Sequence, residues 1–150
     1  MNRTIILLQA GCLMLLASCN TQFNRAWRQA AKTTPPAQSI EGRWEGKWNS
    51  LGTGHTGELR CLVSPASNAD GDHPFTYRAA WRRFLSGSFA ATHRVKQSGG
   101  TFIFHGSHEM PAWAGGTYTY DGAVKNGRFE AAYRCAKDHG TFEMNRPAGQ

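Results

Sequence analysis

The sequence predicts an all-β fold, a single up-and-down antiparallel barrel of about eight strands, and two observations lead to this prediction. The first is a period-two alternation of apolar and polar residues, which is typical of strands with one buried and one exposed face. The second is the regular spacing of turn-forming segments between these runs, with no convincing helical pattern among them. A β-sandwich is the alternative that the same pattern allows.

The stretch EGRWEGKW, residues 41–48, shows the alternation most clearly. Gly42, Trp44, Gly46 and Trp48 share one parity, and charged residues occupy the other. A glycine beside each tryptophan on the same face would leave room for the large ring in a tightly curved sheet. We therefore expect the first strand here, with both tryptophans facing the core.

Seven further runs repeat this pattern, so residues 40–147 are expected to form one barrel domain. The positions of inward parity are Leu59, Cys61 and Val63; Phe75, Tyr77, Ala79 and Trp81; Phe89, Ala91, His93 and Val95; Phe102 and Phe104; Tyr118 and Tyr120; Phe129, Ala131, Tyr133 and Cys135; and Phe142, Met144 and Arg146. The interior of an eight-stranded barrel is just wide enough to be filled by side chains or to hold one small ligand. So many aromatic rings should fill much of it.

Residues 1–18 are expected to be a signal peptide, because Arg3 precedes an apolar run, residues 5–16, that is too short to span a bilayer. The run is followed by LASC at residues 16–19, which resembles the lipobox of bacterial lipoproteins. This resemblance implies cleavage before Cys19, a lipid on its thiol and a membrane anchor in the cell envelope. In the enterobacterial sorting rule Asp after the cysteine means inner-membrane retention, so Asn20 favours the outer membrane, facing the periplasm. An ordinary secretory peptide containing a cysteine is the alternative.

Residues 19–39 are expected to be the lipid anchor and a flexible tether. Pro35 and Pro36 stop a helix and favour an extended chain. Phe23 and Trp27 are four residues apart, so a short helix would place both on one face. Such a helix, with its basic neighbours, would suit an anionic membrane surface, while a disordered spacer with incidental aromatic residues is the other interpretation.

Two positions resemble a conserved feature of the calycin superfamily, which includes lipocalins, fatty-acid-binding proteins and avidins. These are the Gly42-Arg43-Trp44 sequence at the start of the first strand and Arg146 on the inward parity of the last strand. The resemblance covers residues 40–147. It implies that Arg146 lies over Trp44 in a cation–π contact that closes one end of the barrel. It also implies, as an analogy of fold, that the domain binds a small apolar or amphipathic ligand.

Two cysteines, Cys61 and Cys135, remain after the predicted processing, in an oxidising compartment where disulfides persist. Their shared buried parity favours pairing. An up-and-down order of strands, however, places Cys61 toward one end of the second strand and Cys135 at the opposite end of the seventh. A disulfide needs Cα atoms within about 7 Å. A Cys61–Cys135 disulfide and two buried, inert thiols both remain open.

No catalytic motif is visible, so neither an enzyme nor a cofactor is expected. His105, His108 and Glu109 lie close together in HGSHE, but extended chain would point the two histidines to opposite faces. A solvated loop is therefore expected there in place of a metal site. His93 has inward parity among aromatic residues, and we expect a hydrogen-bonded core histidine.

The formal net charge of +7 indicates an anionic partner. In the envelope, anionic lipid or polysaccharide fits this charge better than nucleic acid. Arg78, Arg82 and Arg83 cluster around the third strand as a candidate anionic-surface patch, with a solvated strand face as the alternative. Two functions remain open: a small-ligand carrier of calycin type, and a structural or interaction lipoprotein with a filled barrel and no ligand.

Overall fold

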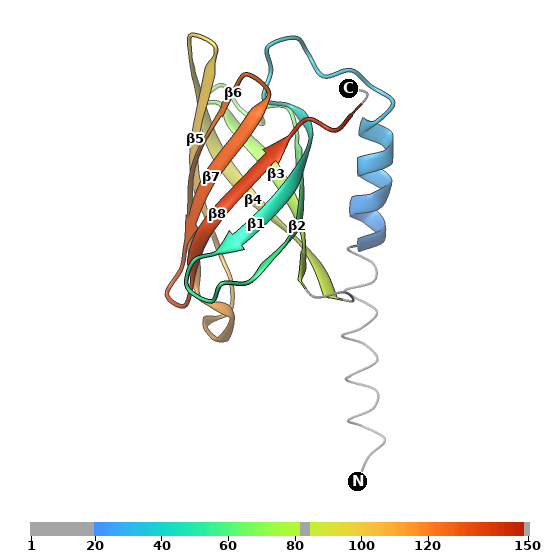
Figure 1. Cartoon of the computed structure of the whole chain (residues 1–150). Helices are drawn as coiled ribbons and strands as arrows, with labels where there is room; N and C mark the ends of the chain where they lie inside the picture. The colour runs from blue at the N-terminus through green and yellow to red at the C-terminus, as the bar shows by residue number, and fades with distance from the viewer. Residues whose placement is uncertain (1–19, 82–84, 149–150) are drawn as a thin grey trace.

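The computed structural model describes residues 20–81 and 85–148, and in this part of the chain eight antiparallel strands form a closed barrel (Figure 1). The strands are β1 (Gly42–Ser50), β2 (Thr56–Val63), β3 (Asp72–Trp81), β4 (Leu85–Ser98), β5 (Thr101–Glu109), β6 (Thr117–Lys125), β7 (Arg128–Arg134) and β8 (His139–Asn145), with a 3-10 turn η1 (Ala112–Ala114) between β5 and β6. Each strand pairs with its sequence neighbours, and β1 pairs with β8. The predicted up-and-down barrel is thus confirmed, and the sandwich alternative is wrong.

Closure depends on the approach of β8 to β1 at Gly46. Gly46 lies opposite Met144 in the β1–β8 register, and a Cβ atom on Gly46 would collide with the backbone oxygen of Glu143. The space that this glycine leaves is therefore occupied by the backbone of β8 and not, as expected from the sequence, by a tryptophan ring. Glycine is needed here because two backbones approach closely.

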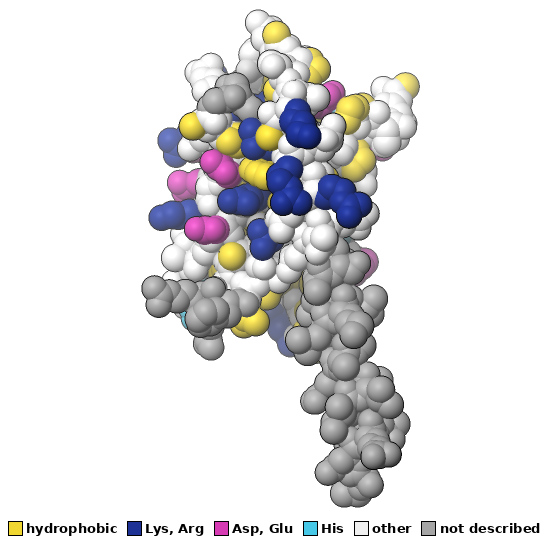
Figure 2. All heavy atoms as spheres, turned by 90° about the vertical axis from the view of Figure 1, so that its right-hand side faces the viewer, with side chains coloured by type: hydrophobic (Ala, Val, Ile, Leu, Met, Phe, Trp, Pro, Cys, Tyr) yellow, Lys and Arg dark blue, Asp and Glu magenta, His cyan; other side chains and the backbone are white. Residues whose placement is uncertain are grey.

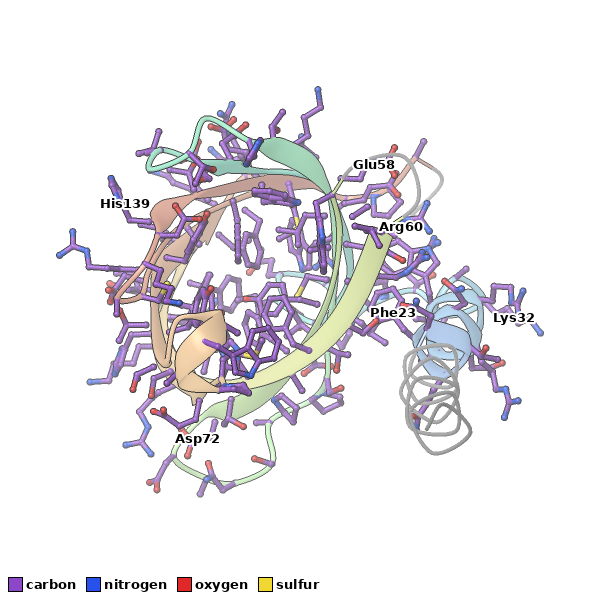
Figure 3. All side chains as sticks on the ribbon, turned by 90° about the horizontal axis from the view of Figure 1, so that it is seen from below. Phe23, Lys32, Glu58, Arg60, Asp72 and His139 are labelled. Carbon is purple, nitrogen blue, oxygen red and sulfur yellow. The ribbon has the colours of Figure 1, made fainter. Side chains whose placement is uncertain are left out.

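Most residues of inward parity form the core, whereas Trp81, Cys135 and Arg146 lie at the ends of the barrel. Trp44, Phe75, Tyr77 and Phe129 are among the buried side chains. Trp81, which shares the inward parity of β3, is 42% exposed because it is the last residue of its strand, where the barrel wall ends. The view along the barrel axis shows side chains filling the space inside the ring of strands (Figure 3).

The alternation of strand directions gives the barrel two ends with different connections. We call the upper end the one formed by residues 64–71, 99–100 and 126–127 together with the segments before β1 and after β8. We call the lower end the one formed by residues 51–55, 110–116 and 135–138 together with the adjoining ends of β3 and β4.

The segment expected to be a flexible tether is ordered over residues 20–30, which form a helix along the outside of the barrel (Figure 1). Phe23 and Trp27 stack on each other, with ring centroids 5.8 Å apart, and are buried against the barrel wall. The guanidinium carbons of Arg43 and Arg60 lie 5.2 and 5.4 Å from the Trp27 ring centroid. Burial of two aromatic rings and these cation–π contacts hold the helix in place.

Because Phe23 and Trp27 pack against the barrel, their rings are not exposed for insertion into a membrane surface. Among the described residues, no helix is both long and apolar enough to cross a membrane. The predicted signal peptide, residues 1–18, and the predicted lipidation site, Cys19, lie outside the described residues.

Candidate functional site

The structure brings Trp44 and Arg146 together at the upper end, as the calycin resemblance implied. The guanidinium carbon of Arg146 lies 3.9 Å from the centroid of the Trp44 ring. The indole Nε1 of Trp44 donates a hydrogen bond to the carbonyl oxygen of Ile40 at 2.8 Å. Trp44 comes from the first strand and Arg146 follows the last, so their contact lies across the seam where the barrel closes.

Backbone carbonyl groups of the segment before β1 and of its first residues surround the guanidinium of Arg146. Its terminal nitrogens donate to the carbonyl oxygens of Ser39 at 2.8 Å, Glu41 at 2.5 Å and Arg43 at 3.3 Å. Within the described residues, no carboxylate forms an ion pair with Arg146. Burial lowers the pKa of Arg146 to about 10, which leaves it protonated at neutral pH. The upper end therefore contains a half-buried cation without a counter-ion from this part of the chain.

A pocket of about 570 Å³ lies beside this pair. It is enclosed by residues 34–39, which cross the end of the barrel, by the β4–β5 turn and by the β6–β7 turn. Its lining residues include the apolar Trp44, Phe102 and Val124, the basic Arg146 and the exposed Lys125, and the amide-bearing Gln38, Gln97 and Asn126. None of the lining residues is acidic. The pocket thus combines an apolar surface with positive charge.

Below the Trp44 ring, aromatic side chains fill the barrel. A continuous series of ring contacts, with centroid separations of 5.7–6.4 Å, runs through Trp44, Phe129, Phe75, Tyr77, Tyr120 and Tyr118. Phe104 and Phe142 pack against this series from neighbouring strands. The interior is therefore a packed core, and the pocket lies at its upper surface.

His93 lies within this core, fully buried, as the sequence predicted. Its Nε2 is 3.0 Å from the hydroxyl oxygen of Tyr77, and its ring contacts Phe75 edge to face at 4.5 Å. The other ring nitrogen, Nδ1, is buried without a hydrogen-bond partner among the described residues, and Gly106 lies against it. Burial lowers the pKa of His93 to about 4, with smaller contributions from His108 and His105. His93 is therefore neutral at physiological pH.

The two histidines of HGSHE point to opposite faces, as expected, but they lie in β5 and not in a loop. His108 faces inward, where its ring stacks between Phe89 and Tyr118 and its Nδ1 is 3.0 Å from the Tyr120 hydroxyl. His105 is exposed on the outer wall. In the described ranges, no three His, Cys, Asp or Glu side chains come together to hold a metal ion.

Cys61 and Cys135 are both free thiols, so of the two alternatives left by the sequence the structure has the unpaired one. Cys61 is fully buried, and its burial raises the pKa of its thiol well above the usual value. Cys135 is half-buried beyond the end of β7, next to Gly115.

The candidate anionic-surface patch is only partly described. Arg78 lies beneath the N-terminal helix, where its terminal nitrogens donate to Asn24 Oδ1 at 3.4 Å and to Ser86 Oγ at 3.3 Å. Arg82 and Arg83 lie outside the described residues. Arg78 therefore binds the helix to the wall. Figure 2 shows Lys and Arg side chains gathered around the middle of the face that carries the helix.

Sequence reasoning missed the pocket and three of its lining residues, Phe102, Val124 and Lys125, as parts of a site. Alternation identified Phe102 as inward-facing, but nothing in the pattern indicated that residues 34–39 cross the end of the barrel. The two prolines, Pro35 and Pro36, were the available signal, because they force an extended segment just before β1.

Comparison of the chain with models of known protein families, with curated proteins and with solved structures finds no significant match.

Proposed function

We propose that this protein is a lipid-anchored protein of the bacterial envelope whose barrel binds a small amphipathic anion at its upper end. The observation on which the proposal rests is the composition of the upper pocket. Trp44, Phe102 and Val124 provide an apolar surface, Lys125 and Arg146 provide positive charge, and the lining has no acidic residue. A molecule with a carboxylate and a compact apolar body matches all three properties.

The size and the hydrogen-bonding capacity of the pocket support this assignment. Its volume of about 570 Å³ falls within the range of about 300–1,000 Å³ that is typical of small-molecule sites. A guanidinium has five N–H donors. Three hydrogen bonds from Arg146 to backbone carbonyls leave two N–H groups that no atom of the described residues accepts. Charge-assisted hydrogen bonds to a carboxylate are among the strong ones, so these groups favour an anionic ligand.

The anchor and location rest on the lipobox-like LASC sequence, with the lipid on Cys19. Asn20 after the cysteine favours the outer membrane, with the barrel in the periplasm. The proposed activity is binding without catalysis, because neither the pocket nor the sequence presents a nucleophile paired with a base. Arg82, Arg83 and the net charge of +7 favour an anionic lipid or polysaccharide as a further partner.

A second candidate function, a structural or interaction lipoprotein without a ligand, is favoured by the filled core. The series of rings from Trp44 to Tyr118 leaves the apolar ligand of a typical calycin no place in the centre of the barrel. In this case the upper pocket would be an incidental gap beneath residues 34–39.

Isothermal titration calorimetry on the mature protein in neutral detergent separates the two candidates. The ligands are 4-phenylbutyrate and decanoate, with 4-phenylbutanamide as the uncharged control. We expect saturable binding of the carboxylates and weaker binding of the amide. Lys125→Ala should weaken carboxylate binding several-fold, because it removes one of the two cations of the pocket. Lys47→Ala removes an equal charge from the exposed outer face of β1 and should have no effect.

Native mass spectrometry of protein purified from cells supplies the complementary observation, a co-purifying anion of low mass. Absence of saturable carboxylate binding together with absence of a co-purifying molecule would contradict the proposal and favour the scaffold. Equal loss of affinity in Lys125→Ala and Lys47→Ala would place the ligand outside the pocket.

A further inference from the structure

The exposed large hydrophobic side chains of this protein are concentrated at one end of the barrel. Among the described residues six such side chains are exposed, and five of them belong to the lower end: Leu51, Trp81, Leu85, Met110 and Trp113. The sixth, Ile103, lies on the outer wall of β5. Trp113 is 79% exposed and Leu51 is 66% exposed. Exposed hydrophobic side chains gathered at one end of a domain are typical of a surface that binds a protein or a membrane.

The five side chains come from three separate connections, and the chain holds at least one of these in a defined conformation. Trp113 lies in η1, which ends at Gly115 with a left-handed φ of 119° and a hydrogen bond from the Gly115 N–H to the Ala112 carbonyl. The ammonium of Lys137, from the β7–β8 connection, donates to the carbonyl oxygen of Trp113 at 2.9 Å. The indole is therefore presented to solvent by a braced turn.

The lower end is also where the described chain begins. The side-chain amide of Asn20 donates to the carbonyl oxygen of Ser86 at 3.5 Å and to its hydroxyl at 3.4 Å, and Ser88 donates to Asn20 Oδ1 at 3.4 Å. Ser86 directly follows the exposed Leu85. These contacts place Asn20, the first described residue, beside the adjoining ends of β3 and β4 (Figure 1). The residue that precedes Asn20 in the sequence is Cys19.

The acidic side chain of the β7–β8 connection is directed toward the protein. The Asp138 carboxylate accepts hydrogen bonds from Ser50 Oγ at 2.6 Å, from the Tyr133 hydroxyl at 2.8 Å and from the His139 N–H at 2.8 Å. The neighbouring Lys137 supplies a cation. The positive charge of Lys137 therefore offsets the negative charge of Asp138 in this connection.

We propose that the lower end is a membrane-docking surface whose five hydrophobic side chains enter the interfacial region of the bilayer that holds the lipid of Cys19. The inference rests on the lipid anchor of the proposed function. Tryptophan side chains favour the interface between headgroups and acyl chains, and apolar side chains that enter it add to the affinity of an acyl anchor. When the lower end contacts the membrane, the upper end and its pocket point away from the membrane into the aqueous space.

Quenching of tryptophan fluorescence by brominated lipid tests this orientation directly. The mature protein is reconstituted into vesicles of phosphatidylethanolamine and phosphatidylglycerol, with or without bromine atoms on the acyl carbons nearest the headgroup. We expect bromine to quench the wild-type emission. Trp81→Phe/Trp113→Phe should lose most of this quenching, because it removes the two exposed indoles while it keeps an aromatic ring at each position.

Trp27→Phe is the matched control, because Trp27 is buried between the helix and the barrel wall. Its removal should leave the bromine-dependent quenching intact. Flotation of the vesicles and fatty-acid labelling of Cys19, measured on the same samples, report the anchor independently of the docking.

Three outcomes have distinct meanings. Bromine-dependent quenching that disappears in the double variant and survives in Trp27→Phe supports the docking surface. A labelled protein that floats with the vesicles but shows equal emission with and without bromine overturns the docking while the anchor stands; the lower end would then serve a protein partner or a second copy. A protein that is neither labelled nor floated overturns the anchor and the docking proposal with it.

Discussion

The two ends of this barrel are built from the same alternation of residues and differ in almost every other respect. At the upper end, Arg146 covers the buried ring of Trp44 and the segment before β1 crosses the opening. At the lower end, Trp81 and Trp113 are exposed. Trp44 thus closes the upper end, whereas Trp81 and Trp113 are surface residues of the lower end. The comparison shows that the position of a residue relative to the barrel rim decides its role.

The largest difference between the ends should appear in stability. Trp44→Ala removes a fully buried ring that contacts Phe129 and Arg146, and the lost burial and the cavity should cost about 3–5 kcal/mol. Trp113→Ala removes a ring of equal size that is mostly exposed, so its free energy of unfolding should change by less than about 0.5 kcal/mol. Urea unfolding measures both. Equal losses in the free energy of unfolding would contradict the assignment of Trp44 to the core and Trp113 to the surface.

The core between the ends should make stability depend on pH. The pKa of His93 is about 4 in the folded protein and about 6.5 in an unfolded chain, so the unfolded state binds more protons between these values. The contribution of His93 to the free energy of unfolding is fully present above pH 6.5. It is lost as the pH decreases toward 4 and amounts to about 3 kcal/mol. Burial also lowers the pKa of His108, which adds a loss of the same sign.

His93→Phe tests this assignment in urea unfolding at several pH values between 4.5 and 7. The variant should have a shallower pH dependence than the wild type, whatever its stability at pH 7. An unchanged slope would assign the pH dependence to other groups.

A smaller effect should follow from removal of the cation at the upper end. Arg146→Ala removes the cation–π contact and the hydrogen bonds to Ser39 and Glu41, at an expected cost of about 1–2 kcal/mol. Because Arg146 touches Trp44, the effects of Arg146→Ala and Trp44→Ala should not add in a double-mutant cycle. A coupling energy near zero would show that the pair does not hold the upper end closed.

The smallest effect is expected at the lower rim. Leu51→Ser replaces an exposed leucine and should leave the free energy of unfolding unchanged within about 0.5 kcal/mol. The same variant should still bind 4-phenylbutyrate as the wild type does, because Leu51 lies at the end opposite the pocket. A loss of carboxylate affinity would contradict the separation of the two ends.

Period-two alternation was sufficient to predict the barrel and most of its core, because the pleat of a strand directs successive side chains to opposite faces. The Trp44–Arg146 contact was implied by the calycin resemblance, and alternation gave only the inward parity of the two residues. Alternation could not indicate where a strand ends, so Trp81 was assigned to the core although it lies at the rim. It also could not predict the docking of Phe23 and Trp27, because that depends on the outer wall of other strands.

The pocket could not be predicted for a similar reason. Its floor comes from inward positions such as Phe102 and Val124, but its wall is the segment 34–39, whose path depends on hydrogen bonds to Arg146 at the other end of the domain sequence. Contacts of this range leave no periodic signal in either segment.

Hydrogen exchange on the mature protein in vesicles, with and without 4-phenylbutyrate, tests most directly whether the two ends have separate functions. The pocket predicts that the ligand slows exchange at residues 34–39, 97–102 and 124–127, which surround it. Residues 110–116 at the lower end should exchange at the same rate in both conditions. Slowed exchange at residues 110–116, or no change at any of the pocket segments, would contradict the assignment of ligand binding to the upper end.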